Sequence, residues 1–175
     1  DLLIYGLNTQ GTAFSIDNIS IKEVTGNQPR LNYDISNGVV QSCPSLLLEP
    51  ASTNLVTYSE DFSQSAWLKT RLTLSSNSII SPSGVLNASK LIPDTTLGQH
   101  KIDITKTVTN GSNVSLSAFV KKGEYNFCCL YEVNSTKGRF FDLSNGTQGG
   151  VFGNAPTTSH IEDYGNDWYK ISITT

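Results

Sequence analysis

The sequence predicts an all-β fold, an antiparallel β-sandwich, from three observations. Apolar residues alternate with polar ones in short runs, most clearly at residues 114–120, and no segment carries the apolar period of about 3.6 residues that marks a helix. Turn-forming pairs such as Asn110-Gly111, Asn145-Gly146 and Gly165-Asn166 separate these runs. Charged residues make up only 15% of the chain, whereas helix surfaces are rich in Glu, Lys and Arg.

Each run has the features of a strand bounded by a turn. The first, residues 14–21, alternates apolar and polar positions and shifts its register near Asp17-Asn18. Later runs are separated by Gly, Asn, Ser and Pro, which favour turns. Further strands are predicted at residues 67–74, 100–108, 114–120, 127–133, 139–143, 160–164 and 168–173. Many strands at this spacing with no helix between them favour a sandwich or a barrel.

Composition and charge argue against several classes of function. The net charge is −3 at pH 7 and no basic run is present, so we expect no nucleic-acid binding. No stretch reaches the roughly 18 apolar residues of a membrane-spanning helix, so we expect no membrane insertion. A surface built from Ser, Thr, Asn and Gly is typical of extracellular and virion proteins.

The stretch from Pro44 to Trp67, PSLLLEPASTNLVTYSEDFSQSAW, carries a resemblance to a protein family. It resembles a join in tail-fibre and other structural proteins of bacteriophages that leads into a β-sandwich similar to carbohydrate-binding modules. Residues 29–34, 141–147 and 161–169 extend the resemblance. It implies a jelly-roll topology, a virion or extracellular location, and partners that are copies of the chain, neighbouring fibre domains or a cell-surface glycan.

The order of the chain is unusual for such a module. Residues 13–24, AFSIDNISIKEV, resemble the closing strand of a carbohydrate-binding jelly roll, yet they come first. We therefore expect residues 1–24 to complete a preceding or neighbouring sandwich, by strand addition in a head-to-tail assembly. On this interpretation residues 25–53 are an extended linker, and residues 54–175 form a sandwich that is incomplete at its C-terminal end.

Aromatic and polar residues suggest two kinds of site. Aromatic rings pack against the C–H faces of sugars, so a glycan site is predicted, although structural packing is the competing interpretation for each ring, above all for Trp168. Tyr131 and Tyr164 are wider candidates for the same face. The predicted glycan-binding residues are Trp67, Tyr58, His100, Lys121, Tyr125 and Arg139.

A structural calcium ion is the cofactor that the sequence suggests. Glu60 and Asp61 lie in an oxygen-rich turn that suits a hard cation. The resemblance implies that Asp17 of the closing strand adds a further ligand. The alternative interpretation is a solvated turn in which Asp61 accepts hydrogen bonds from local N–H groups.

We expect no enzymatic activity, because no nucleophile elbow, phosphate loop or zinc-binding spacing is present. The expected function is that of a structural and adhesive module of a virion fibre or extracellular filament. The alternative is a carbohydrate-binding accessory domain of a larger secreted enzyme that degrades polysaccharides.

Overall fold

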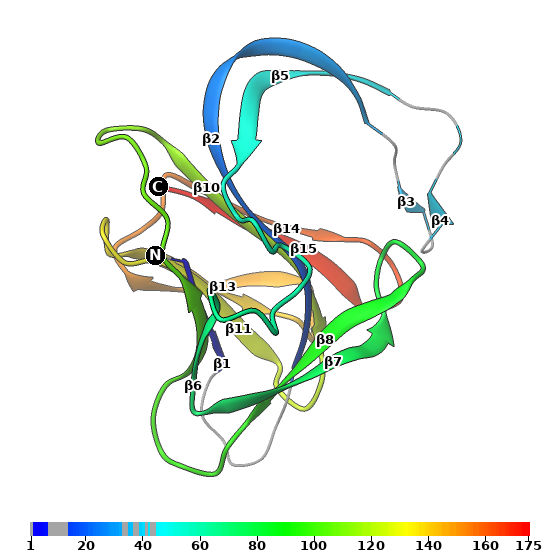
Figure 1. Cartoon of the computed structure of the whole chain (residues 1–175), viewed down its shortest axis with the longest axis vertical. Helices are drawn as coiled ribbons and strands as arrows, with labels where there is room; N and C mark the ends of the chain where they lie inside the picture. The colour runs from blue at the N-terminus through cyan, green and yellow to red at the C-terminus, as the bar shows by residue number, and fades with distance from the viewer. Residues whose placement is uncertain (1, 7–13, 33–34, 37–38, 41, 43–44) are drawn as a thin grey trace.

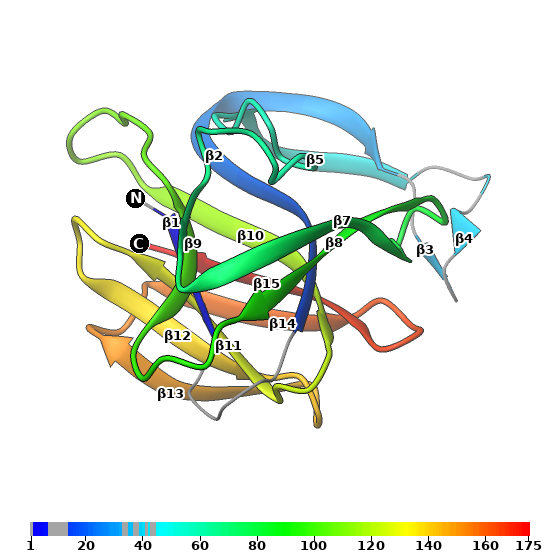
Figure 2. The same ribbon diagram turned by 60° about the horizontal axis from the view of Figure 1, so that its bottom comes forward.

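Two antiparallel sheets form a β-sandwich (Figures 1 and 2). The computed structural model describes residues 2–6, 14–32, 35–36, 39–40, 42 and 45–175, and it describes side chains at residues 15–20, 42 and 53–175. The described residues include no helix, so the predicted all-β, antiparallel fold is confirmed. The assignment to the jelly-roll topology stays a prediction.

In each sheet a strand from the start of the chain lies between strands from its later part. The six-stranded sheet has the order β13 (Thr147–Gly153), β12 (Lys137–Asp142), β11 (Phe127–Glu132), β1 (Leu2–Gly6), β9 (His100–Ile104) and β6 (Leu68–Thr70). The seven-stranded sheet has the order β14 (Thr158–Asp163), β15 (Trp168–Thr174), β10 (Val114–Lys122), β2 (Phe14–Asn32), β8 (Leu86–Pro93) and β7 (Leu72–Ile80). Its seventh strand, β5 (Ser45–Asn54), pairs with β2.

The hydrophobic core lies between the two sheets and follows the alternation seen in the sequence. In β10 the apolar residues 114, 116, 118 and 120 are buried while the residues between them are only half-buried. Ile171 and Ile173 of β15 face the same core and are fully buried. From the facing sheet, Ile102 and Leu130 complete the layer.

Strand β2 shifts its register where the sequence predicts it. Asn18 has a φ of 42°, and the pairing of β2 with β10 shifts between Ser117 and Phe119. This local irregularity, a β-bulge, lets both Ile16 and Ile19 reach the core, where neither is exposed. The predicted shift near Asp17-Asn18 is confirmed.

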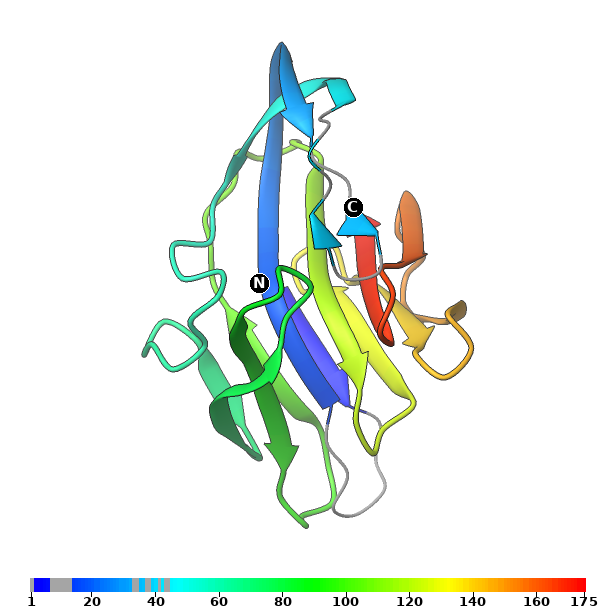
Figure 3. The ribbon, with the colours of Figure 1, turned by 90° about the vertical axis from the view of Figure 1, so that its right-hand side faces the viewer.

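Strands β1 and β2 are central strands of the sandwich of their own chain, which corrects the expected place of residues 1–24. Strand β1 pairs with β11 on one side and β9 on the other, and β2 lies between β10 and β8 (Figure 3). Ile16 lies opposite Val120 of β10. Residues 54–175 leave a gap in the middle of each sheet, and the backbone hydrogen bonds available on both sides of that gap hold β1 and β2. The expected strand addition to a neighbour is therefore wrong for this structure.

The described residues 25–32 and 45–53 pair with each other as a two-stranded ribbon, and this corrects the extended linker expected over residues 25–53. Beyond the sandwich β2 continues to Asn32 and pairs with β5, from Asn27 opposite Pro50 to Asn32 opposite Ser45. The ribbon rises away from the body of the sandwich, and the short strands β3 (Ile35–Ser36) and β4 (Val39–Val40) pair beside its end (Figures 1 and 3).

No helix within the described residues is long and apolar enough to cross a membrane.

Candidate functional site

Two turns at one end of the seven-stranded sheet form the walls of a cavity. The first joins β7 to β8, where the Ser81 N–H donates to the Val85 carbonyl (2.8 Å) and the Gly84 N–H donates to the Ser81 carbonyl (2.9 Å). The second joins β14 to β15, where the Tyr164 N–H donates to the Trp168 carbonyl (2.8 Å). Both turns use the Gly, Ser, Asn and Pro residues that mark breaks in the strand pattern.

The second turn has an uncommon backbone conformation. Gly165, Asn166 and Asp167 have φ values of 78°, 53° and 62°, so three consecutive residues occupy the left-handed region. Glycine adopts this region freely, and Asn and Asp tolerate it better than other residues. Non-glycine residues held in this region carry a conformational cost and occur preferentially where a ligand is held.

The cavity has a volume of about 270 Å³, slightly below the roughly 300–1,000 Å³ of sites for drug-sized ligands. Trp168 connects its two walls, because the indole Nε1–H donates to the Ile80 carbonyl (3.1 Å). Apolar and aromatic groups form most of the lining, and a cation and an amide add polar contacts. The lining residues are Ile79, Ile80, Ser81, Pro82, Gly84, Lys121, Tyr164, Gly165, Asn166 and Trp168.

Lys121 supplies the positive charge at the cavity. It lies directly opposite Trp168 in the pairing of β10 with β15, so the ammonium and the indole come from neighbouring positions on one face of the sheet. The ammonium donates to the Asn166 carbonyl (2.5 Å) and lies 3.5 Å from the Asp167 carboxylate. The Lys121 side chain is 21% exposed and that of Asp167 is 81% exposed. An apolar wall with a cation and an amide suits a ligand that has both C–H faces and hydroxyl groups.

Three of the six predicted glycan-binding residues are buried. Trp67, His100 and Tyr125 are 2%, 2% and 5% exposed, so their rings are not available for stacking on a sugar. Trp67 packs against Phe62 in an edge-to-face arrangement with ring centroids 5.2 Å apart. Its Nε1–H donates to the Tyr58 carbonyl (2.8 Å). Trp67 therefore has the structural packing role that was the alternative to stacking on a sugar.

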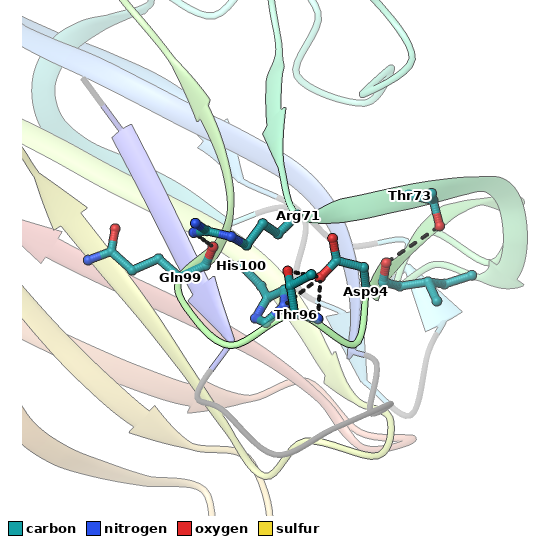
Figure 4. Close-up of polar contacts among 7 residues, drawn as sticks. Arg71, Thr73, Asp94, Thr96, Gln99 and His100 are labelled. Atoms are coloured by element: carbon teal, nitrogen blue, oxygen red, sulfur yellow. Dashed lines mark hydrogen bonds and ion pairs between the residues drawn. The ribbon is translucent and has the colours of Figure 1, made fainter.

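His100 shapes a loop beside β9 instead of facing a ligand (Figure 4). Its Nε2 lies 3.3 Å from the Asp94 carboxylate, and the same carboxylate accepts hydrogen bonds from the N–H (2.9 Å) and hydroxyl (2.5 Å) of Thr96. Arg71 approaches the same loop, where its guanidinium donates to the Gln99 carbonyl (3.5 Å). These contacts fix the turn between β8 and β9.

The other three predicted residues lie on different parts of the sandwich. Tyr58 is 43% exposed in the loop before β6. Arg139 belongs to β12 of the six-stranded sheet and donates to the Gly149 carbonyl (3.0 Å). Lys121, in the seven-stranded sheet, is the member that lines the cavity. The structure therefore does not bring the six residues together.

The residues that line the cavity include some that were minor candidates for glycan binding in the sequence and some that the sequence did not indicate. For Trp168 the packing interpretation is the one that holds, because the ring is 3% exposed. Tyr164 is one of the wider candidates for the glycan-binding face. Ile80 and Asn166 were missed. The turn sequence Gly165-Asn166 was the available signal, but nothing in the sequence indicates that it meets residues 79–84.

The predicted calcium residues come together only in part. Asp17 is 4% exposed, and its Oδ1 has no hydrogen-bond partner in the structure. Burial, and then the negative charge of Glu60, raise the pKa of Asp17 to about 6, although hydrogen bonds from Asn18 and Ser81 oppose the shift. A buried carboxylate with a free oxygen beside a second carboxylate fits a hard cation.

The Asp61 carboxylate accepts hydrogen bonds within its own turn, which is the alternative to binding calcium that the sequence offered. Its carboxylate accepts from the Ser63 N–H (3.0 Å), the Ser63 hydroxyl (2.5 Å) and the Gln64 amide (2.6 Å), and these bonds lower its pKa. Among the described residues, no group of three or more His, Cys, Asp or Glu side chains could hold a metal. Of the three predicted residues, Asp17 and Glu60 are therefore the two whose carboxylates would hold a calcium ion, and the ion would neutralise the buried charge of Asp17.

The substitution Asp17→Asn is expected to change stability in opposite directions with and without calcium. The folded-state pKa of about 6 lies above the ordinary value of 3.8, so stability is lost as pH rises from about 4 through 6. In chelator at pH 7.5 the substitution removes this cost, roughly 3 kcal/mol at most, and raises the melting temperature. In millimolar calcium the wild type gains stability and the variant does not, as measured by thermal melts.

Asp61→Asn is the matched control, because Asp61 lies in the same loop and points its oxygens at its own turn. It should keep the response to calcium. A wild-type melting temperature that calcium leaves unchanged would rule out the ion.

Comparisons with protein-family models, curated proteins and solved structures find no match for this chain.

Proposed function

We propose that this chain is a non-enzymatic adhesive module of a virion fibre or extracellular filament, and that it binds surface glycans in the cavity beside Trp168. The observation that carries the proposal is the lining of that cavity, in which Ile80 and Tyr164 provide apolar surface and Lys121 and Asn166 provide polar groups. The Trp168 ring is 3% exposed, so it braces the two walls of the cavity and does not serve as a stacking surface. Sugars present both kinds of surface, because each ring has a C–H face and hydroxyl groups at its edge.

The strained turn supports the same site. Asn166 and Asp167 keep left-handed conformations at the rim of the cavity, and the hydrogen bonds of Tyr164 and Trp168 hold the turn in place. A preformed rim lowers the ordering cost of binding. The low charge of the chain and its Ser-, Thr- and Asn-rich surface are consistent with the virion or extracellular location that the family resemblance implies.

A cavity of this size holds about one sugar unit, so the affinity of each site is expected to be weak. Repetition of the module along a fibre would raise the overall affinity without new contacts. The proposal does not include exchange of residues 1–24 between copies, because β1 and β2 are paired on both sides within their own chain.

A glycan array probed with a multimeric preparation of the chain tests this function. We expect binding to a subset of glycans, and we expect Ile80→Asp to weaken it by about tenfold or more, because the change puts a charge on the apolar wall. Ile80 is 57% exposed, so the substitution should leave the melting temperature nearly unchanged.

Val151→Asp is the matched control, since Val151 is 43% exposed on β13 of the other sheet. It should bind as the wild type does. An array that stays blank for the wild-type multimer would contradict the proposed function.

A further inference from the structure

We infer that the cavity beside Trp168 prefers a sugar that carries a carboxylate, with Lys121 as the residue that recognises it. This inference rests on the proposed function and narrows the class of ligand. It follows from the contacts of the Lys121 ammonium and from the charges around the cavity.

The Lys121 ammonium has an N–H donor that its contacts within the protein do not use. An ammonium has three N–H donors, whereas the described contacts of Lys121 are with the Asn166 carbonyl and, at 3.5 Å, the Asp167 carboxylate. The side chain is 21% exposed, so neighbouring residues cover most of its length and hold the ammonium at the cavity. A ligand oxygen in the cavity can therefore accept a hydrogen bond from a donor that the protein leaves available.

Asp167 is a weak and replaceable counter-ion for that cation. Its side chain is 81% exposed and its oxygen lies beyond normal hydrogen-bond distance from Lys121, and exposed ion pairs of this kind contribute little. A carboxylate inside the cavity could approach Lys121 to hydrogen-bond distance, and such charge-assisted hydrogen bonds are stronger than neutral ones. A neutral hydroxyl gains less, because it cannot replace the negative charge of Asp167.

Asp163 and Lys170, two other charged residues on the strands around the cavity, have contacts of their own, and the Asp17 carboxylate lies behind Ser81 in the buried interior. Asp163 accepts a hydrogen bond from the Gly165 N–H (2.8 Å). The Lys170 ammonium lies 6.0 Å from the centroid of the Tyr164 ring and is opposite Glu162 in the strand pairing. Among the lining residues of the described chain, Lys121 is the one with a positive charge. The expected ligand therefore places its C–H face toward Ile80 and Tyr164 and its carboxylate toward Lys121.

The test compares acidic sugars with matched neutral ones. Multimeric chain is bound to beads that display glucuronic acid, galacturonic acid or sialic acid, and to beads that display glucose or galactose. We expect at least one acidic probe to bind about tenfold better than the neutral probes at low salt, with the preference declining as salt rises. Lys121→Gln should abolish the preference.

Two further variants separate recognition from a structural role. Asp167→Asn removes the competing carboxylate, so it should strengthen binding of the acidic probe by about two- to fivefold and leave the neutral probes unchanged. Lys170→Gln removes a cation that does not line the cavity and should preserve the preference.

The outcomes distinguish the inference from the function on which it rests. Equal or better binding of the neutral probes, lost on Ile80→Asp, would overturn the acidic preference and leave the proposed function standing. An acidic preference that survives Lys121→Gln would also overturn the inference. Failure of every probe, on these beads and on the array, would overturn both.

Discussion

Deletion of residues 1–24 is expected to abolish folding of the sandwich. Strands β1 and β2 are internal to the two sheets, so their loss leaves unpaired N–H and C=O groups on β11, β9, β10 and β8. It also removes Ile16 and Ile19, both fully buried, from the core. Circular dichroism, thermal melts and the spread of amide resonances in NMR should all report an unfolded or aggregated chain.

A second deletion provides the control. Val24 lies opposite Ser52, so residues 25–51 can be replaced by Asn-Gly, which closes the two strands as a tight hairpin. This variant loses the projecting ribbon and should keep a cooperative melt. A chain without residues 1–24 that remains monomeric and melts cooperatively would show that β1 and β2 are dispensable.

Replacement of Trp67 by alanine should cost about 3–5 kcal/mol of unfolding free energy, the range for a large buried aromatic side chain. The ring is 2% exposed and packs on Phe62, and its loss also leaves the Tyr58 carbonyl without the indole donor. Trp67→Phe should cost roughly 1–3 kcal/mol, because it keeps most of the apolar contact and loses the hydrogen bond. Urea denaturation measures both changes.

The same variants distinguish packing from stacking on a sugar. Glycan binding per folded molecule should be unaffected by Trp67→Phe, because the ring lies in the core and does not line the cavity. If Trp67→Phe lost glycan binding while its unfolding free energy stayed unchanged, Trp67 would contact the glycan, as the sequence suggested.

Sequence reasoning predicted the strands better than it predicted the site. The alternation at residues 114–120 matches β10, and the break at Asp17-Asn18 matches the bulge of β2. The Gly165-Asn166 turn was also expected, and it forms the rim of the cavity. By contrast, Trp67, His100 and Tyr125 were assigned to a surface by residue type, and each is buried.

The difference has a physical reason. The alternation of core-facing and solvent-facing residues along a strand depends on neighbours within a few positions, and so does the place where the chain turns. The sequence by itself therefore determined the all-β class, most strands and the bulge. Which strands lie side by side depends on hydrogen bonds and apolar contacts between distant segments. Only the tertiary structure therefore decided that β1 and β2 occupy the middle of both sheets, and that residues 79–84 meet Lys121 and the Tyr164–Trp168 turn to form one cavity.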